Sequence, residues 1–179
     1  KPIVIIKAKF SDDSEIEVQV NSEFENKTNA EKIALIYLEE IGRLPKLFRK
    51  NLETVSIHKG YENFGGGNNN FVIHHDNGLE LKKYGLLEEI FLHEGVHTSL
   101  DSDHRLSNAW INAQKSDNGN FISDYAKQNP KREDLAETVP LCFALKYKRD
   151  RLSDDIIRKI EKAIPNRIEY CNGVFENIN

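Results

Sequence analysis

The feature that most constrains this chain is the H-E-x-x-H run at residues 93–97, which lies in a largely apolar stretch from Gly85 to Asp101. On an α-helix, residues four apart share one face, so His93 and His97 would point the same way and could bind a single Zn²⁺. A carboxylate beside that face can hold and deprotonate a water molecule, which makes Glu94 the candidate general base. The sequence therefore predicts a metal-binding helix in this stretch.

The residues around the motif predict that this helix is buried nearly all round. Apolar residues occupy both the stripe of the histidines and the opposite side: Leu86, Ile90 and Leu100, then Phe91, Leu92 and Val96. The alternative is a pair of histidines that serve only the core. Two imidazoles and a carboxylate on a buried helix would cost free energy without a partner that satisfies all three groups, which favours a metal ion.

Length and charge narrow the class of protein. A chain of 179 residues fits one domain, which we divide into a sheet-rich half at 1–84 and a helical half at 85–179. The net charge of −4 and the lack of a basic block argue against nucleic acid or an anionic membrane as the main partner. No apolar run reaches transmembrane length. We expect a monomer that binds neither nucleic acid nor a membrane.

Two further observations bear on processing and redox state. The chain contains no methionine, so we expect that Lys1 follows from processing of the N-terminus. We expect a secreted or extracellular protein.

The chain contains two cysteines. Cys142 and Cys171 either pair or remain two buried thiols, and their spacing leaves both possibilities open.

The first half of the chain predicts strands. Runs at 3–10 and 15–20, joined by a polar turn, predict a hairpin, and 54–58 predicts another strand. A capping box at Thr28 and Glu31 predicts the start of a helix that Gly42 can end. We interpret the run Gly-Gly-Gly-Asn-Asn-Asn at 65–70 as a mobile loop. The strand predicted at 71–75 could line a cleft edge and pair with an extended substrate.

The second half predicts helices. One covers 106–114, another starts at Asn129-Pro130 and should kink at Pro140, and a last one runs from a Ser153 cap to Ile164 and stops at Pro165. Strands in the first half and helices in the second predict an α+β fold, with a small mixed sheet packed on a buried helix.

A catalytic zinc ion needs three protein ligands and an open position. Beyond the histidines, the candidates are Asp103, His104, Glu133 and Glu137. The extended H-E-x-x-H-x-x-G-x-x-H pattern places Leu100 and Asp103 where it requires Gly and His, so we do not favour it. Glu133 and Glu137 are four residues apart, so one could bind the metal while the other holds a ligand imidazole. The alternative is a solvated acidic helix face.

These motifs together resemble the gluzincin metallopeptidases, most closely the anthrax lethal factor-like family. The resemblance rests on the run at 93–97, on Tyr125-Ala126 and on Glu-Asp-Leu-Ala-Glu at 133–137, and covers roughly Leu86 to Leu145. It implies a zincin-like fold and roles for six residues: His93, His97 and Glu133 as zinc ligands, Glu94 as general base, Glu137 as support for a ligand imidazole, and Tyr125 as the phenol that steadies the oxyanion.

The resemblance implies a zinc-dependent peptidase, an endopeptidase acting on a polypeptide substrate. In that reaction zinc would polarise the scissile carbonyl while Glu94 moves the proton to the leaving amine. The alternative is a non-catalytic zinc-binding or toxin-like interaction module on the same fold. A closed four-ligand site that includes Asp103 or His104 would favour this alternative, because structural zinc has no open position.

Overall fold

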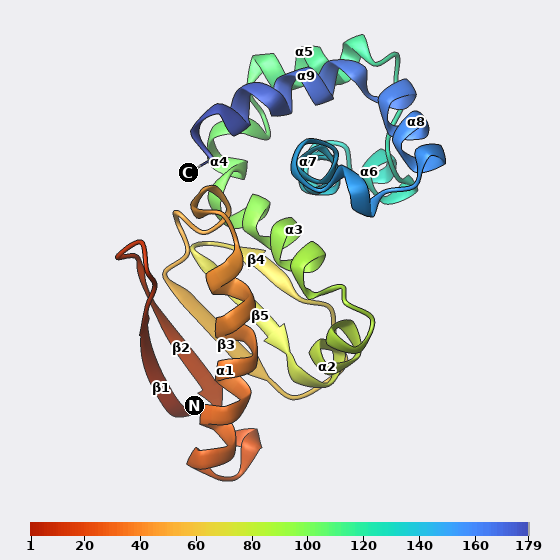
Figure 1. The fold of residues 1–179 in the computed structure, drawn as a ribbon. Coiled ribbons are helices and arrows are strands. Elements are labelled where there is room, and N and C mark those ends of the chain that lie inside the picture. Colours follow the sequence, from red (N-terminus) through yellow and green to blue (C-terminus); the bar gives the residue numbers. More distant parts are fainter. Residues whose placement is uncertain (179) are drawn as a thin grey trace. The chain divides into compact units, whose positions relative to one another are not determined.

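The computed structural model describes residues 1–178 and contains two compact units, Lys1–Ser99 and Leu100–Asn179. The first unit holds a five-stranded mixed sheet with helices, and the described part of the second unit is built from helices (Figure 1). The predicted α+β fold is therefore confirmed. The helix that carries the H-E-x-x-H motif belongs to the sheet-containing unit. Among the described residues, no helix is long and apolar enough to cross a membrane.

The sheet combines parallel and antiparallel pairs. Its strands are β1 (Pro2–Lys9), β2 (Glu15–Asn21), β3 (Thr54–His58), β4 (Gly65–Gly67) and β5 (Asn70–His74), in the spatial order β1-β2-β3-β5-β4. β1 and β2 form the predicted antiparallel hairpin, β2, β3 and β5 run parallel, and β4 is antiparallel to β5. The predictions of the hairpin and of the strand at 54–58 are confirmed.

One face of this sheet forms the core of the first unit. Two rows of buried residues lie in register across β2, β3 and β5: Val18, Val55 and Phe71, then Val20, Ile57 and Ile73. The alternation of these residues with less buried ones is the period of a strand with one covered face. The helices α1 (Lys27–Arg43) and α3 (Leu87–Ser99) pack on the sheet, and Figure 1 shows α1 lying across it. The Phe91 ring of α3 stacks on Phe71 at a centroid distance of 5.7 Å.

The glycine-rich run is not the mobile loop that we predicted. Residues 65–67 form β4, and a two-residue turn at Asn68 and Asn69, with φ of 49° and 60°, leads into β5. Asn is one of the few residues that adopt positive φ readily, and two such residues suit a tight hairpin. A Cβ atom on Gly66 would lie 2.4 Å from the carbonyl oxygen of Glu94, so the absence of a side chain permits close packing on α3.

The position of β4 also corrects the prediction for 71–75. β5 lies between β3 and β4, and residues 70–72 pair with both neighbours, so this part of the strand is not an edge that could bind a substrate strand. The strand ends at His74. His75 begins α2 (His75–Lys83), a helix that the sequence did not predict.

The ends of two helices in the first unit differ from the prediction. The side chain of Asn26 accepts a hydrogen bond from the backbone N–H of Asn29 at 2.9 Å, so Asn26 rather than Thr28 is the N-cap of α1. The helix continues past Gly42 to Arg43. α3 begins at Leu87, which leaves Leu86 outside the helix and exposed rather than on its buried stripe.

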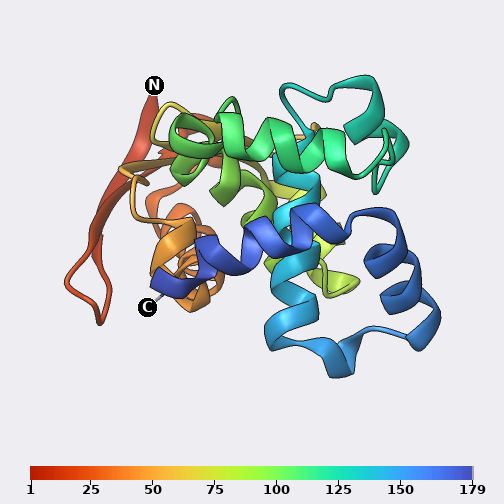
Figure 2. The ribbon, with the colours of Figure 1, turned by 90° about the horizontal axis from the view of Figure 1, so that it is seen from above.

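The second unit packs short helices around α7. Its helices are α4 (Asp101–His104), α5 (Asn108–Ser116), α6 (Asp124–Gln128), α7 (Asp134–Tyr147), α8 (Asp154–Ala163) and α9 (Pro165–Val174). Figure 2 shows α9 crossing α7, and α5 packs along α9. An apolar cluster of Leu145, Ile157, Ile160 and Ile164 joins α7 to α8. Cys142 of α7 and Cys171 of α9 are buried thiols that form no disulfide.

The helix predicted to start at Asn129-Pro130 is α7. It begins at Asp134, four residues after Pro130. Asn129 ends α6 with φ of −126° and ψ of 53°, and the backbone turns before Glu133, the N-cap residue of α7. A residue that precedes proline is disfavoured in the helical region, so Asn129 ends one helix instead of capping the next. α7 continues through Pro140 to Tyr147. The Ser153 cap of α8 is confirmed, but Pro165 also begins the further helix α9.

Two neighbouring glycines of β4 test the close packing on α3. We expect Gly66→Ala to lower the free energy of unfolding by about 1–3 kcal/mol, because the new Cβ would overlap the backbone of Glu94. Gly65→Ala is the matched control, since its Cβ would meet only Val72 at 3.7 Å and should change stability by less than about 0.5 kcal/mol. Urea unfolding of both variants measures the difference. Equal stability of the two variants would contradict the close approach.

Candidate metal centre

Helix α3 presents both histidines of the motif on one side. His93 and His97 are one turn apart, and their ring centroids lie 5.0 Å from each other. Both residues are half-buried, whereas Glu94 between them is only 5% exposed. The spacing of the motif thus produces the predicted pair of neighbouring imidazoles on a helix that is largely buried.

Close contacts on two sides fix the position of α3 in the first unit. A Cβ on Gly95, inside the motif, would lie 2.6 Å from the carbonyl oxygen of Phe48 in the 3₁₀ helix η2 (Lys46–Phe48). On β4, the backbone N–H of Gly67 donates to the Thr98 hydroxyl at 2.9 Å. That hydroxyl donates in turn to the carbonyl oxygen of Asn70 at 3.4 Å. The histidines therefore project from a helix whose backbone has little room to move.

In the second unit, Glu133 is a buried carboxylate at the start of α7. It is 4% exposed, and its Oε1 accepts a hydrogen bond from Nε of Arg132 at 3.2 Å. Tyr125 of α6 is 52% exposed, and its phenol bonds to Glu133. Partial burial, followed by the charge of Glu133 and this hydrogen bond, raises the pKa of Tyr125. Tyr125 therefore stays protonated and can donate a hydrogen bond near Glu133.

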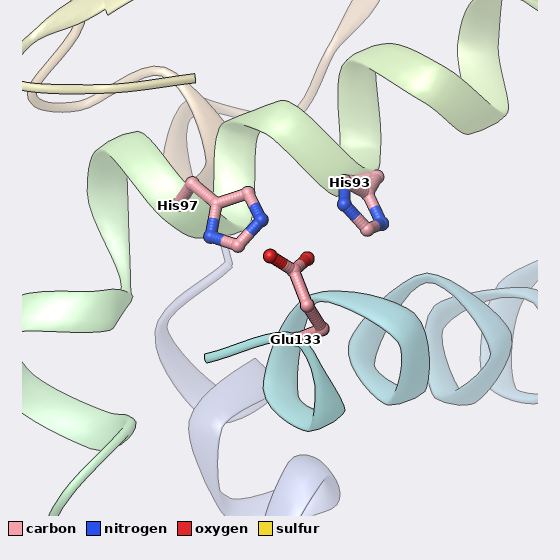
Figure 3. Close-up of side chains that lie close together, drawn as sticks. All are labelled: His93, His97 and Glu133. Carbon is pink, nitrogen blue, oxygen red and sulfur yellow. The ribbon is translucent and has the colours of Figure 1, made fainter. Parts of the chain in front are cut away.

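Among the described residues, His93, His97 and Glu133 form a group that could hold a metal ion (Figure 3). Each residue offers one ligand atom, and these atoms all lie within 4.8 Å of one another. Asp103 and His104, the other candidates in the sequence, are not members of this group. Nδ1 of His104 instead lies 2.6 Å from the hydroxyl of Tyr170.

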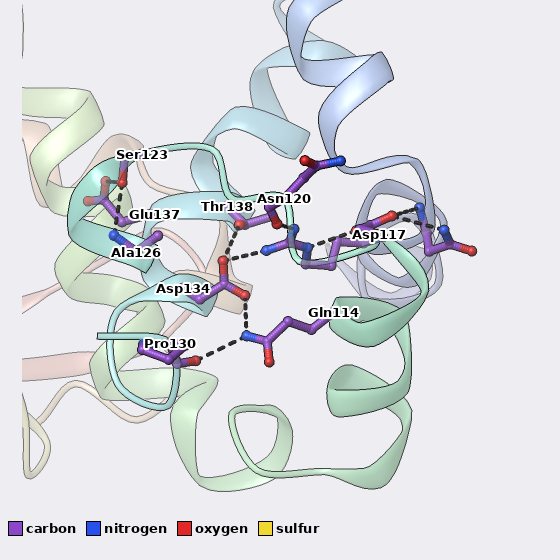
Figure 4. Close-up of polar contacts among 11 residues, drawn as sticks. Gln114, Asp117, Asn120, Ser123, Ala126, Pro130, Asp134, Glu137 and Thr138 are labelled. Atoms are coloured by element: carbon purple, nitrogen blue, oxygen red, sulfur yellow. Dashed lines mark hydrogen bonds and ion pairs between the residues drawn. The ribbon is translucent and has the colours of Figure 1, made fainter. Parts of the chain in front are cut away.

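Glu137, the remaining candidate, bonds to the helix that carries Tyr125. The Ser123 hydroxyl donates to Oε2 of Glu137 at 2.7 Å and accepts from the backbone N–H of Ala126 at 3.0 Å (Figure 4). Ser123 is the N-cap of α6, so one hydroxyl both caps that helix and ties it to α7. We did not identify Ser123 from the sequence, although a Ser followed by Asp124 is a typical helix start. The predicted role of Glu137, holding a ligand imidazole, stays a prediction.

Comparisons with protein-family models, with curated proteins and with solved structures found no match to the chain. The resemblance to the gluzincin metallopeptidases therefore rests on the motifs at 93–97, 125–126 and 133–137 alone.

Glu133 and Glu137 should differ in their effect on metal affinity. We expect Glu133→Ala to weaken binding of Zn²⁺ by more than about 100-fold, because it would remove one of three candidate ligands, and Glu137→Ala to weaken it by about 10- to 100-fold. Titration against a chromophoric chelator measures both, with the exposed Glu169→Ala on α9 as the control. The reverse ranking would transfer the ligand role to Glu137. No effect from either substitution would return it to Asp103.

Proposed function

We propose that the protein is a zinc-dependent peptidase of the gluzincin type, similar to the anthrax lethal factor-like family. The observation that carries this proposal is the group formed by His93, His97 and Glu133. Two imidazoles and one glutamate are the ligand set of the zinc ion in peptidases such as thermolysin. Glu94, which follows the first histidine directly, completes the motif that zinc peptidases use for hydrolysis.

The chemistry of the donor set fits zinc better than Ca²⁺ or Mg²⁺. Nitrogen ligands disfavour Ca²⁺ and Mg²⁺, which take oxygen atoms. Zn²⁺ accepts imidazole nitrogen and carboxylate oxygen together, and three protein ligands would leave one position for water or substrate. A buried carboxylate such as Glu133 is also stabilised by a nearby cation.

In the proposed reaction, the residues of the chain bind the peptide and move one proton. A zinc ion, when bound, would polarise the scissile carbonyl and lower the pKa of a water molecule so that it could lose a proton near neutral pH. Glu94 would take a proton from the attacking water and transfer it to the leaving amine. The protonated phenol of Tyr125 would donate a hydrogen bond to the oxygen of the tetrahedral intermediate.

The edge of the sheet supports a polypeptide as the substrate. β4 is the last strand of the sheet next to α3, and an extended chain can pair with the edge of a sheet through backbone hydrogen bonds. Pairing of this kind depends on hydrogen bonds between backbone groups, which an extended peptide can form. We therefore propose that the substrate binds β4 in an extended conformation.

Metal content and metal-dependent hydrolysis test the proposal together. We expect one zinc ion per chain after purification without added metal, and cleavage of a mixed peptide library that stops with a chelator and returns on addition of Zn²⁺. Elemental analysis and mass spectrometry of the digest are the measurements. A protein that neither contains nor takes up zinc would refute the proposal.

Glu94→Gln separates catalysis from metal binding. The substitution keeps the size of the side chain and removes the proton acceptor, so we expect unchanged zinc content and a loss of kcat of about 10²- to 10⁴-fold or more. His93→Ala is the contrasting variant, since it should lose metal and activity together. If Glu94→Gln cleaves at the wild-type rate, Glu94 is not the general base.

A further inference from the structure

Glu133 lies on a short segment, Pro130–Asp134, whose two ends bond to one side chain of α5. Nε2 of Gln114 donates to the carbonyl oxygen of Pro130 at 3.2 Å and to Oδ2 of Asp134 at 2.9 Å (Figure 4). An amide nitrogen carries two hydrogens, so both bonds form at the same time. The Gln114 amide therefore bridges the two ends of the segment that carries Glu133, the candidate metal ligand.

Asp134, the second end of the segment, is itself held firmly. It is fully buried, and its Oδ1 accepts a hydrogen bond from Nη1 of Arg167 at 2.5 Å. Arg167 of α9 is also fully buried, and its Nε bonds to Oδ2 of Asp117 at 2.8 Å. Buried, charge-assisted hydrogen bonds of this kind are short and strong. Gln114 thus links Pro130 to a residue that is anchored in the interior of the second unit.

The backbone bonds of the segment link this anchor to Glu133. The N–H of Glu133 donates to the carbonyl oxygen of Asn129 at 2.8 Å, and its own carbonyl oxygen accepts from the N–H of Glu137 at 2.8 Å. Glu133 precedes Asp134 directly, so a fixed Asp134 leaves the backbone of Glu133 few conformations. A ligand held in place before the metal arrives loses less conformational entropy on binding.

We propose that Gln114 is a positioning residue for the metal ligand Glu133. This inference rests on the proposed function, because it assigns Gln114 to the same metal site. Gln114 does not belong to the ligand group and acts through the backbone of Pro130–Asp134. A purely structural role would instead change the stability of the second unit without a specific effect on metal affinity.

Gln114→Met tests the proposal, because methionine keeps the length of the side chain and removes both donors. Gln114 is only half-buried, so the variant should fold. We expect its affinity for Zn²⁺, measured by competition with a chromophoric chelator, to fall by about 3- to 10-fold. Ser107→Ala is the control on the same helix: it removes the N-cap bond to Trp110 at 3.1 Å and should weaken α5 without changing metal affinity.

A double-mutant cycle shows whether Gln114 acts through Glu133. In a Glu133→Ala background, Gln114→Met should have no further effect on the affinity for Zn²⁺. An equal loss in both backgrounds, or the same loss in Ser107→Ala, would assign Gln114 a general structural role and overturn the proposal.

Hydrogen exchange of the metal-free protein provides a readout that does not depend on zinc. We expect faster exchange at the amides of Glu133 and Glu137 in Gln114→Met, with unchanged exchange in α8. Unchanged exchange at 133 and 137 would overturn the positioning role even if the wild type binds zinc. A wild type that takes up no zinc would instead refute the proposed function, and the assignment of Gln114 to a metal site with it.

Discussion

Helix α3 packs so closely on its neighbours that two positions accept only glycine. A Cβ on Gly66 would lie 2.4 Å from the Glu94 backbone, and one on Gly95 would lie 2.6 Å from the Phe48 backbone. Both contacts involve backbone atoms, which cannot rotate away as a side-chain end can. The sheet, η2 and the helix with the two histidines therefore have one relative arrangement in the first unit, and the positions of His93 and His97 depend on it.

The second unit fixes the start of α7 by a different physical means. Arg167 and its partners Asp117 and Asp134 are almost completely removed from water. Removal of one partner from a buried ion pair typically costs about 3–5 kcal/mol, because the remaining charge is left uncompensated. Such a network adds little net stability, because desolvation offsets much of the attraction between its charges. Here it fixes Asp134, the first residue of α7, which directly follows Glu133. Buried ion pairs thus hold the start of α7, whereas close backbone contacts at glycine hold α3.

The sequence predicted the elements whose signals are local. The alternation in β2 and the spacing of His93 and His97 each follow from the period of a single strand or helix, and both were found correctly. The run at 65–70 was misjudged because glycine is also required where two backbones meet closely, and that contact lies about 30 residues away in the chain. Asn129-Pro130 carries the residues of a helix start, yet the restriction that proline places on Asn129 ends the previous helix instead.

The polar contacts of the second unit could not be predicted in the same way. Gln114 bonds to residues 16 and 20 positions away, and no local pattern distinguishes it from an exposed helical glutamine. Arg167 pairs with Asp117 across 50 positions. The motif at 133–137 indicated which glutamates to examine, but their different partners, Arg132 for Glu133 and Ser123 for Glu137, emerge only from the folded chain.

The composition of the candidate ligand group also bears on whether the proposed zinc ion would be catalytic or structural. Structural sites are usually closed by four protein ligands and are rich in cysteine. Among the described residues, the group of His93, His97 and Glu133 has three members, and Cys142 and Cys171 are buried thiols outside it. The group also lacks His104, whose ring bonds to Tyr170, and Asp103. For the proposed zinc ion, three protein donors would leave one position for water, as the proposed hydrolysis with Glu94 as general base requires.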